Sequence, residues 1–164
     1  MGSDQVYHPS CTGDKVGDIV NRYPELDVAM IQLTPSTSTR FQNNTYFQAT
    51  APNRLVDSKT IQFGSFFEVD AMSTGLVELM FEMVTMEKPV RPLGHPPIPC
   101  IQWKRYNVMR IFGAQNADLA DGMCGAPIVE CDTGAVAGFF HLANGDHAVS
   151  AGLDDLIAEG WSIC

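Results

Sequence analysis

Basic residues are scarce in this sequence. Its 164 residues include 10 Lys and Arg against 19 Asp and Glu, and the formal net charge is −9 at pH 7. An acidic surface repels phosphate backbones and anionic lipid headgroups, so we expect neither nucleic acid nor a membrane as a partner. No apolar run approaches the roughly 20 residues of a membrane-spanning helix, and none resembles a secretion signal. These absences predict an intracellular, cytoplasmic protein.

Paired cysteines are a second absence. The five cysteines are irregularly spaced, and no two form a C-x-x-C pair. An odd and irregular set favours neither a disulfide framework nor a structural zinc site, and it predicts reduced thiols. The sequence therefore gives no reason to expect a metal or another cofactor.

Helical periodicity is confined to the C-terminus, where Leu153, Leu156 and Ile157 share one face and Gly160 ends the helix. Elsewhere, short β-branched and apolar segments alternate with turn residues, which indicates an all-β barrel or sandwich. The predicted strands are residues 15–20, 28–33, 60–63, 65–69, 76–86, 106–112, 126–130, 135–142 and 147–150. Residues 88–100 contain five prolines and predict a surface loop, because proline cannot donate to a sheet ladder.

One segment combines small residues with a thiol, Asp121-Gly122-Met123-Cys124-Gly125-Ala126-Pro127. A nucleophile must be exposed on a tight turn while backbone N–H groups point at the developing oxyanion. Gly122 allows the chain to turn its N–H inward, and the N–H of Cys124 would be the second donor. The segment therefore predicts Cys124 as a nucleophile beside an oxyanion hole formed by Gly122 and Cys124. The alternative is a buried and inert thiol.

Two ordered stretches resemble the trypsin/chymotrypsin superfamily. The first runs from Asp121 to Phe140 and is similar to the family's G-D-S-G-G-P nucleophile loop, which is followed by a strand, a turn and a strand with V-x-G. The second, Leu26 to Leu33, is similar to the D-I-A-L-I-x-L segment that carries the family's catalytic Asp, here Asp27. Cysteine in place of serine resembles the viral 3C-like branch and, more loosely, fungal trypsin-like domains. The resemblance implies an all-β, chymotrypsin-like double β-barrel with a C-terminal helix.

The resemblance also implies an activity. Cys124 would attack a peptide carbonyl as a thiolate, as in a cysteine-nucleophile endopeptidase, and Asp27 would orient a histidine that moves the proton. His8 is the one histidine before Asp27 and is the candidate base, although it could equally be an exposed loop residue. The same resemblance assigns the primary substrate pocket to Phe140, His141 and Leu142.

His141 is shifted by one residue from the histidine with which the 3C-like branch recognises Gln. One residue reverses the face of a strand, so a satisfied strand histidine is the alternative.

Few residues precede the first predicted strands, so the first barrel is expected to be incomplete. We expect residues 1–50 to hold its last strands and the start of a linker, and residues 51–164 to form the C-terminal barrel with the nucleophile loop and the helix. Three interpretations remain open: an active cysteine peptidase, a peptidase-like binding or regulatory module without its base, and a fragment that needs missing N-terminal strands. The expected partners are a peptide or protein substrate and, in the third case, that missing segment or a partner chain.

Overall fold

The computed structural model describes residues 4–8, 10, 12–26, 28–40, 51–71, 74–87, 103–113, 119 and 123–163. The chain divides into two compact units, Met1–Asn44 and Thr45–Cys164. The predicted boundary near residue 50 and the proline-rich residues 88–100 lie outside the described residues.

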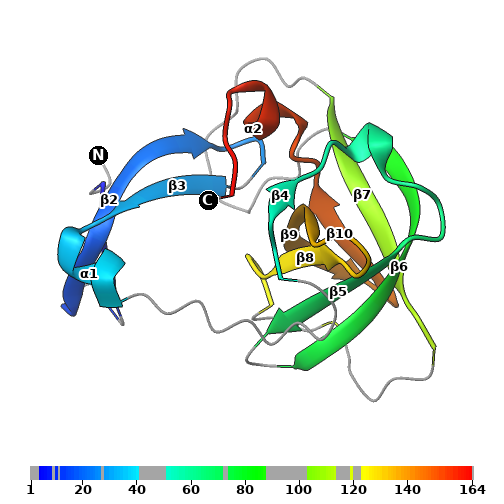
Figure 1. Cartoon of the computed structure of the whole chain (residues 1–164), viewed down its shortest axis with the longest axis horizontal. Coiled ribbons are helices and arrows are strands. Elements are labelled where there is room, and N and C mark those ends of the chain that lie inside the picture. The colour runs from blue at the N-terminus through cyan, green and yellow to red at the C-terminus, as the bar shows by residue number, and fades with distance from the viewer. Residues whose placement is uncertain are drawn as a thin grey trace. The chain divides into compact units, whose positions relative to one another are not determined.

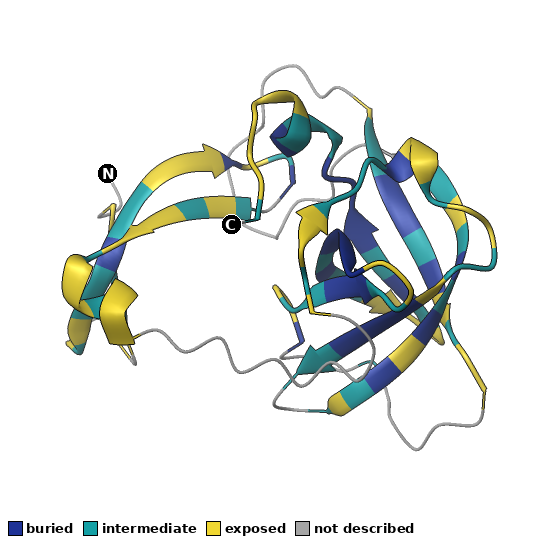
Figure 2. Cartoon of the chain, in the orientation of Figure 1, coloured by how far each residue is buried: buried dark blue, intermediate teal, exposed yellow. Residues whose placement is uncertain are grey.

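The first unit is a three-stranded antiparallel sheet of order β1-β2-β3 (Figure 1). Its elements are β1 (Gln5–His8), β2 (Asp14–Tyr23), β3 (Val28–Leu33) and the short helix α1 (Pro35–Arg40). Three apolar side chains of the sheet are exposed: Val20 by 52%, Ile31 by 42% and Leu33 by 36%. Most of this unit is exposed or half-buried (Figure 2). Among its described strands the sheet does not close.

The second unit contains a closed barrel of six antiparallel strands (Figure 1). These strands are β5 (Phe66–Ala71), β6 (Gly75–Glu87), β7 (Lys104–Ile111), β8 (Pro127–Glu130), β9 (Ala135–Asn144) and β10 (His147–Ala151). They run in the order β10-β7-β6-β5-β8-β9, and the pairing of β9 with β10 closes the barrel. A further short strand, β4 (Arg54–Leu55), pairs in parallel with the start of β9.

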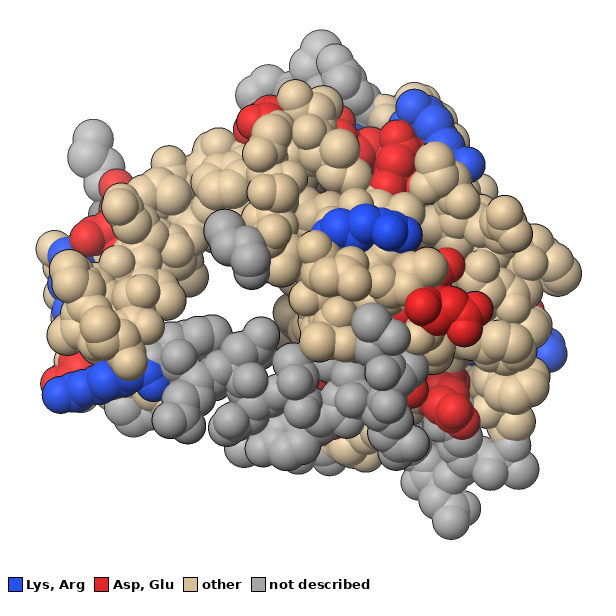
Figure 3. Space-filling model, viewed as in Figure 1, with Lys and Arg blue, Asp and Glu red and all other residues tan. Residues whose placement is uncertain are grey.

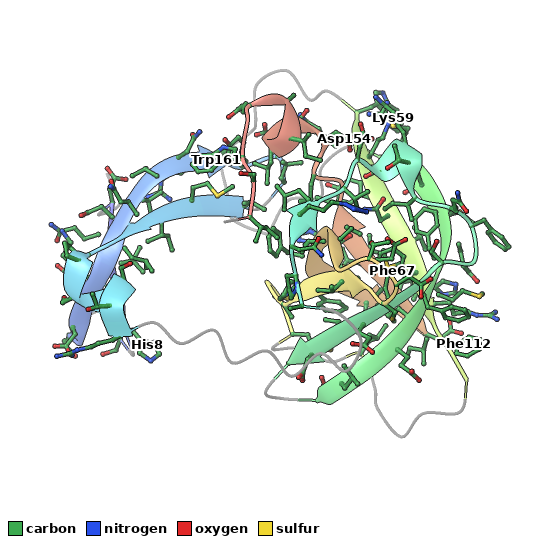
Figure 4. All side chains as sticks on the ribbon, viewed as in Figure 1. His8, Lys59, Phe67, Phe112, Asp154 and Trp161 are labelled. Atoms are coloured by element: carbon green, nitrogen blue, oxygen red, sulfur yellow. The ribbon has the colours of Figure 1, made fainter. Side chains whose placement is uncertain are left out.

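Alternation along the strands fills the barrel. Phe67 and Val69 on β5 and Leu79 on β6 are 0% exposed, because every second side chain of a strand points to the same face. Phe67 points into the barrel (Figure 4), and the buried side chains concentrate in these strands (Figure 2). Burying a side chain of this size contributes about 1.5–3 kcal/mol. The apolar periodicity of the sequence therefore accounts for the barrel.

The C-terminal helix is also confirmed. It is α2 (Asp154–Ala158), with Leu156 buried and Gly160 following at φ 87°. Asp154 lies at its start, hydrogen-bonded to Asp57, and Arg105 Nη1 lies 3.4 Å from its Oδ1. The hydrogen bond between Asp154 and Asp57 ties α2 to the segment that follows β4. Figure 4 shows Asp154 at the same end of this unit as Lys59.

The predicted strand 60–63 is wrong. A 3₁₀ helix, Ser58–Thr60, occupies its start, and a turn at Phe63 and Gly64 its end. Asp57 causes the difference, since its side chain accepts the Lys59 N–H at 2.8 Å and its carbonyl accepts the Thr60 hydroxyl at 2.8 Å. Such local hydrogen bonds compete with strand formation.

Candidate active site

Cys124 lies on a tight turn just before β8. Met123, which precedes it, is 1% exposed and anchors the turn in the barrel core. The Ala126 N–H donates to the Met123 carbonyl at 2.9 Å, which closes the turn. Gly125 has φ 88°, a conformation that side chains disfavour. The side chain of Cys124 is therefore exposed while its neighbours are fixed.

Two backbone hydrogen bonds attach this turn to β9. The Gly125 N–H donates to the Phe140 carbonyl at 2.9 Å, and the Phe140 N–H donates to the Ala126 carbonyl at 2.8 Å. The thiol of Cys124 in turn donates to the carbonyl of His141 at 3.4 Å. The nucleophile predicted from the loop and the pocket residues predicted from β9 therefore lie side by side.

A β-bulge determines which way the predicted pocket residues face. Phe140 is opposite Ser150 of β10 and Leu142 is opposite Val149, so His141 is the extra residue. Ser150 is fully buried, whereas Val149 is half-buried. Phe140 accordingly points into the core, and Leu142 lies on the face away from it. Without the bulge, strict alternation would have returned Leu142 to the core.

His141 is half-buried, and its ring centroid lies 6.4 Å from that of Tyr106, with the two rings tilted by 38°. Tyr106 is itself 5% exposed, so this contact fixes the imidazole against the barrel wall. Phe140 is 3% exposed and part of the core, and its N–H and carbonyl are both hydrogen-bonded to the turn that carries Cys124. His141 and Leu142 are the predicted pocket residues with accessible side chains.

The remaining predicted site residues are less informative. Asp27 and Gly122 lie outside the described residues. His8 is exposed at the end of β1, where it pairs with Asp14. It belongs to the first unit and Cys124 to the second. The assignments of Asp27 and His8 as catalytic residues and of Gly122 as an oxyanion donor therefore stay predictions.

His147 was not singled out by the sequence, and it is held by two carboxylates. Its Nε2 lies 3.0 Å from Glu82 Oε2, and its Nδ1 lies 2.8 Å from Asp146 Oδ1. Arg110 Nε is 3.5 Å from the other oxygen of Glu82. Both ring nitrogens of His147 are therefore engaged, one by Glu82 of β6 and the other by Asp146 of the turn between β9 and β10. No sequence spacing predicts the contacts of His147 with Glu82, because these residues lie on separate strands, β10 and β6.

The second described thiol, Cys131, contrasts with Cys124. It lies in the turn between β8 and β9 and is half-buried. Burial raises its pKa to about 11, and the charges of Glu68, Asp132 and Glu78 act in the same direction. Figure 3 shows acidic side chains on the viewed face of the second unit and fewer, separate basic ones. Burial, helped by these nearby carboxylates, thus keeps Cys131 protonated near neutral pH.

Two negative findings apply to the described residues only. No helix among them is both long and apolar enough to cross a membrane. No group of three or more His, Cys, Asp and Glu side chains among them could hold a metal ion.

Comparison with solved structures identifies the fold. A glutamic acid-specific serine protease that uses a histidine triad in substrate binding superposes with a TM-score of 0.59 and 15% identity, over 99% of this chain and 80% of its own. The inactive form of the Rv3671c protease superposes with a TM-score of 0.55 and 13% identity, over 90% of this chain and 66% of its own. The chain has the chymotrypsin-like fold of the trypsin-like serine proteases.

The sequence by itself identifies no relative. No protein-family model matches it, and no curated protein does. The chain spans just under two thirds of the Rv3671c protease. The solved structures confirm the predicted chymotrypsin-like fold. They do not test the prediction that Cys124 is a nucleophile.

Proposed function

We propose that this chain is a peptidase domain of chymotrypsin-like fold that uses Cys124 as its nucleophile. The main support is the position of Cys124, exposed on a turn that two backbone hydrogen bonds attach to β9. The thiolate would attack the carbonyl carbon of a peptide bond, and the N–H groups of Gly122 and Cys124 would stabilise the oxyanion. Collapse of this intermediate releases the amine and leaves a thioester, which water hydrolyses.

The proton transfers need a base, for which we propose His8 oriented by Asp27. An imidazole accepts the thiol proton and later gives it to the leaving amine, while the carboxylate stabilises the imidazolium. The support here is the family's order of residues, Asp27 before Cys124, and the presence of one histidine ahead of them. A histidine supplied by another segment would have to replace His8 if this assignment is wrong.

For specificity, we propose that His141 contacts the substrate side chain on the acyl side of the scissile bond. One protease of similar fold is specific for glutamic acid and binds it with histidines. The 3C-like branch that the motif resembles recognises Gln near this position. Glu and Gln share a side-chain carbonyl oxygen that accepts an imidazole N–H. The substrate is therefore proposed to carry Gln or Glu before the cleaved bond.

A peptide-library cleavage assay tests the proposal. Mass spectrometry would show cleavage after Gln or Glu, which Cys124→Ala abolishes and the matched control Cys131→Ala leaves unchanged. His141→Ala should raise KM for these peptides more than for peptides with Ala at the same position. Cleavage that persists in Cys124→Ala would disprove the nucleophile assignment.

A second candidate function is a peptidase-like binding or regulatory module. The thiol of Cys124 donates to a backbone carbonyl. Among the described residues of the second unit, no imidazole nitrogen is hydrogen-bonded to Cys124, and both nitrogens of His147 are engaged elsewhere. A chain that binds Gln or Glu peptides without cleaving them, and whose Cys124→Ala variant binds equally well, would favour this function.

The third interpretation is a fragment that needs further N-terminal strands. Its support is the three-stranded first unit, on which Val20, Ile31 and Leu33 are exposed. Further strands that closed this sheet into a barrel would bury such side chains. Activity that appears only after addition of a longer natural N-terminal segment would favour this interpretation.

A further inference from the structure

Asn107 is a buried polar residue in the wall of the barrel. It lies on β7, is 0% exposed and is paired with Ser150 of β10. Its Nδ2 donates to the carbonyl oxygen of Ala137 on β9 at 2.8 Å. Because β10 lies between β7 and β9, this amide links two strands that share no ladder.

The acceptor of this hydrogen bond is itself in a β-bulge. Gly138 is paired with Ile128 of β8 and Val136 with Val129, so Ala137 is the extra residue. An extra residue is left out of the ladder. Asn107 therefore takes the place of a ladder partner for the Ala137 carbonyl.

The nucleophile loop depends on the segment of β9 between its two bulges. The bulge at Ala137 begins this segment and the bulge at His141 ends it. Phe140, within it, makes both hydrogen bonds to Gly125 and Ala126. A slip of β9 by one residue would break these bonds and reverse the faces of Phe140 and His141.

Stability alone does not account for Asn107. Among the described residues, Asn107 Oδ1 and the hydroxyl of Ser150 are buried without a hydrogen-bond partner. A buried polar atom without a partner costs at least as much as one neutral hydrogen bond contributes. Buried polar groups of this kind can instead specify one register among several.

We infer that Asn107 is a positioning residue, whose amide fixes the register of β9 and thereby places Cys124 beside His141. The structural part of this inference stands on the contacts above, and its catalytic meaning rests on the proposed function. Asn107 touches no substrate in this scheme and acts through Ala137 and Phe140.

The test compares Asn107→Leu, which keeps the branched shape of the side chain and removes the amide, with Ser58→Ala. Ser58 is a matched control because it is also a buried polar side chain, 1% exposed, and it lies outside β9. Amide hydrogen exchange and nitrogen-15 NMR spectra report on Gly125, Phe140 and His141 without any need for activity. Thermal melting and peptide cleavage complete the comparison.

We expect Asn107→Leu to melt within a few degrees of the parent. Exchange of the Gly125 and Phe140 amides should be about tenfold faster, because local opening no longer has to break the hydrogen bond between Asn107 and Ala137. The His141 resonances should shift, and kcat for peptide cleavage should fall by up to about 100-fold, as expected for a displaced nucleophile. Ser58→Ala should change none of these readouts.

Two results would overturn the inference. One is exchange and resonances at Gly125, Phe140 and His141 that match those of Ser58→Ala. The other is an Asn107→Leu variant that does not fold, because Asn107 would then be needed for stability itself. A parent without peptidase activity would remove the proposed function, but the exchange and NMR results would still decide the role of Asn107.

Discussion

The two described cysteines allow a direct test of the nucleophile assignment by alkylation. Cys131 has a pKa raised to about 11, by burial first and then by Glu68, Asp132 and Glu78. A free thiol has a pKa of about 8.5, so at pH 7.5 the thiolate fraction of Cys131 is lower by a factor of about 300. The thiolate is the reacting species. We therefore expect Cys131 to react with iodoacetamide about 300 times more slowly than free cysteine.

Cys124 is expected to behave in the opposite way, because its side chain is exposed. Under the proposed function it should be alkylated at least as fast as free cysteine at pH 7.5, and Cys124→Ser should remove this fast reaction. The assay follows each cysteine-containing peptide by quantitative mass spectrometry between about pH 6.5 and 9.5, the range in which free thiols ionise. Alkylation of Cys131 within about tenfold of free cysteine would refute the effect of burial and the acidic neighbours. Alkylation of Cys124 as slow as that of Cys131 would refute its assignment as nucleophile.

Three further substitutions test the fold around the site. Burial first, and then the hydrogen bond with Asp57, raise the pKa of Asp154, so the folded chain holds this proton more tightly than the unfolded chain does. The stability that this carboxyl contributes is present at low pH and is lost as the pH rises above the usual carboxyl range. Asp154→Asn should therefore flatten the fall in unfolding free energy above that range, measured by urea titration. A fall as steep as the parent's would contradict this. Gly138→Ala places a Cβ 2.4 Å from Ser150 Oγ; we expect a loss of about 1–3 kcal/mol, and an unchanged melting temperature would speak against this close contact. Gly125→Ala forces a side chain to φ 88°; we expect the unfolding free energy to fall by about 1–2 kcal/mol, measured by denaturant titration, and a variant as stable as the parent would show that the turn can relax.

The sequence predicted the barrel well because its signals are local. β3 has the predicted bounds, 28–33, and β6 extends the predicted strand 76–86 by one residue at each end. Both contain runs of β-branched and apolar residues that a pleated surface favours. The strand and turn predictions failed where a side chain hydrogen-bonds to a nearby backbone group. Asp57 turns 58–60 into a 3₁₀ helix, and the Thr34 hydroxyl accepts the Thr37 N–H at the start of α1.

The residues of the candidate site were also predictable only where their signal is local in the sequence. Cys124 was identifiable because the residues that expose it, Met123 and Gly125, are its neighbours in the chain. Asn107 was not identifiable, because its acceptor lies 30 residues away and across a strand. His8 and Asp27 were named from a resemblance and Gly122 from the pattern of the loop, and all three stay predictions.

His141 shows why a sequence register can mislead. Its position is shifted by one residue from that of the histidine in the family pattern, and in a regular strand this offset would reverse its face. The structure places a bulge of one residue at this position, and Phe140 remains in the core while Leu142 faces away from it. When a bulge accommodates one extra residue, only that residue leaves the ladder, and the residues on either side keep their partners in the neighbouring strand. The offset that weakens the family resemblance is therefore compatible with a pocket formed by His141 and Leu142, because the backbone, and not the count of residues, determines the face.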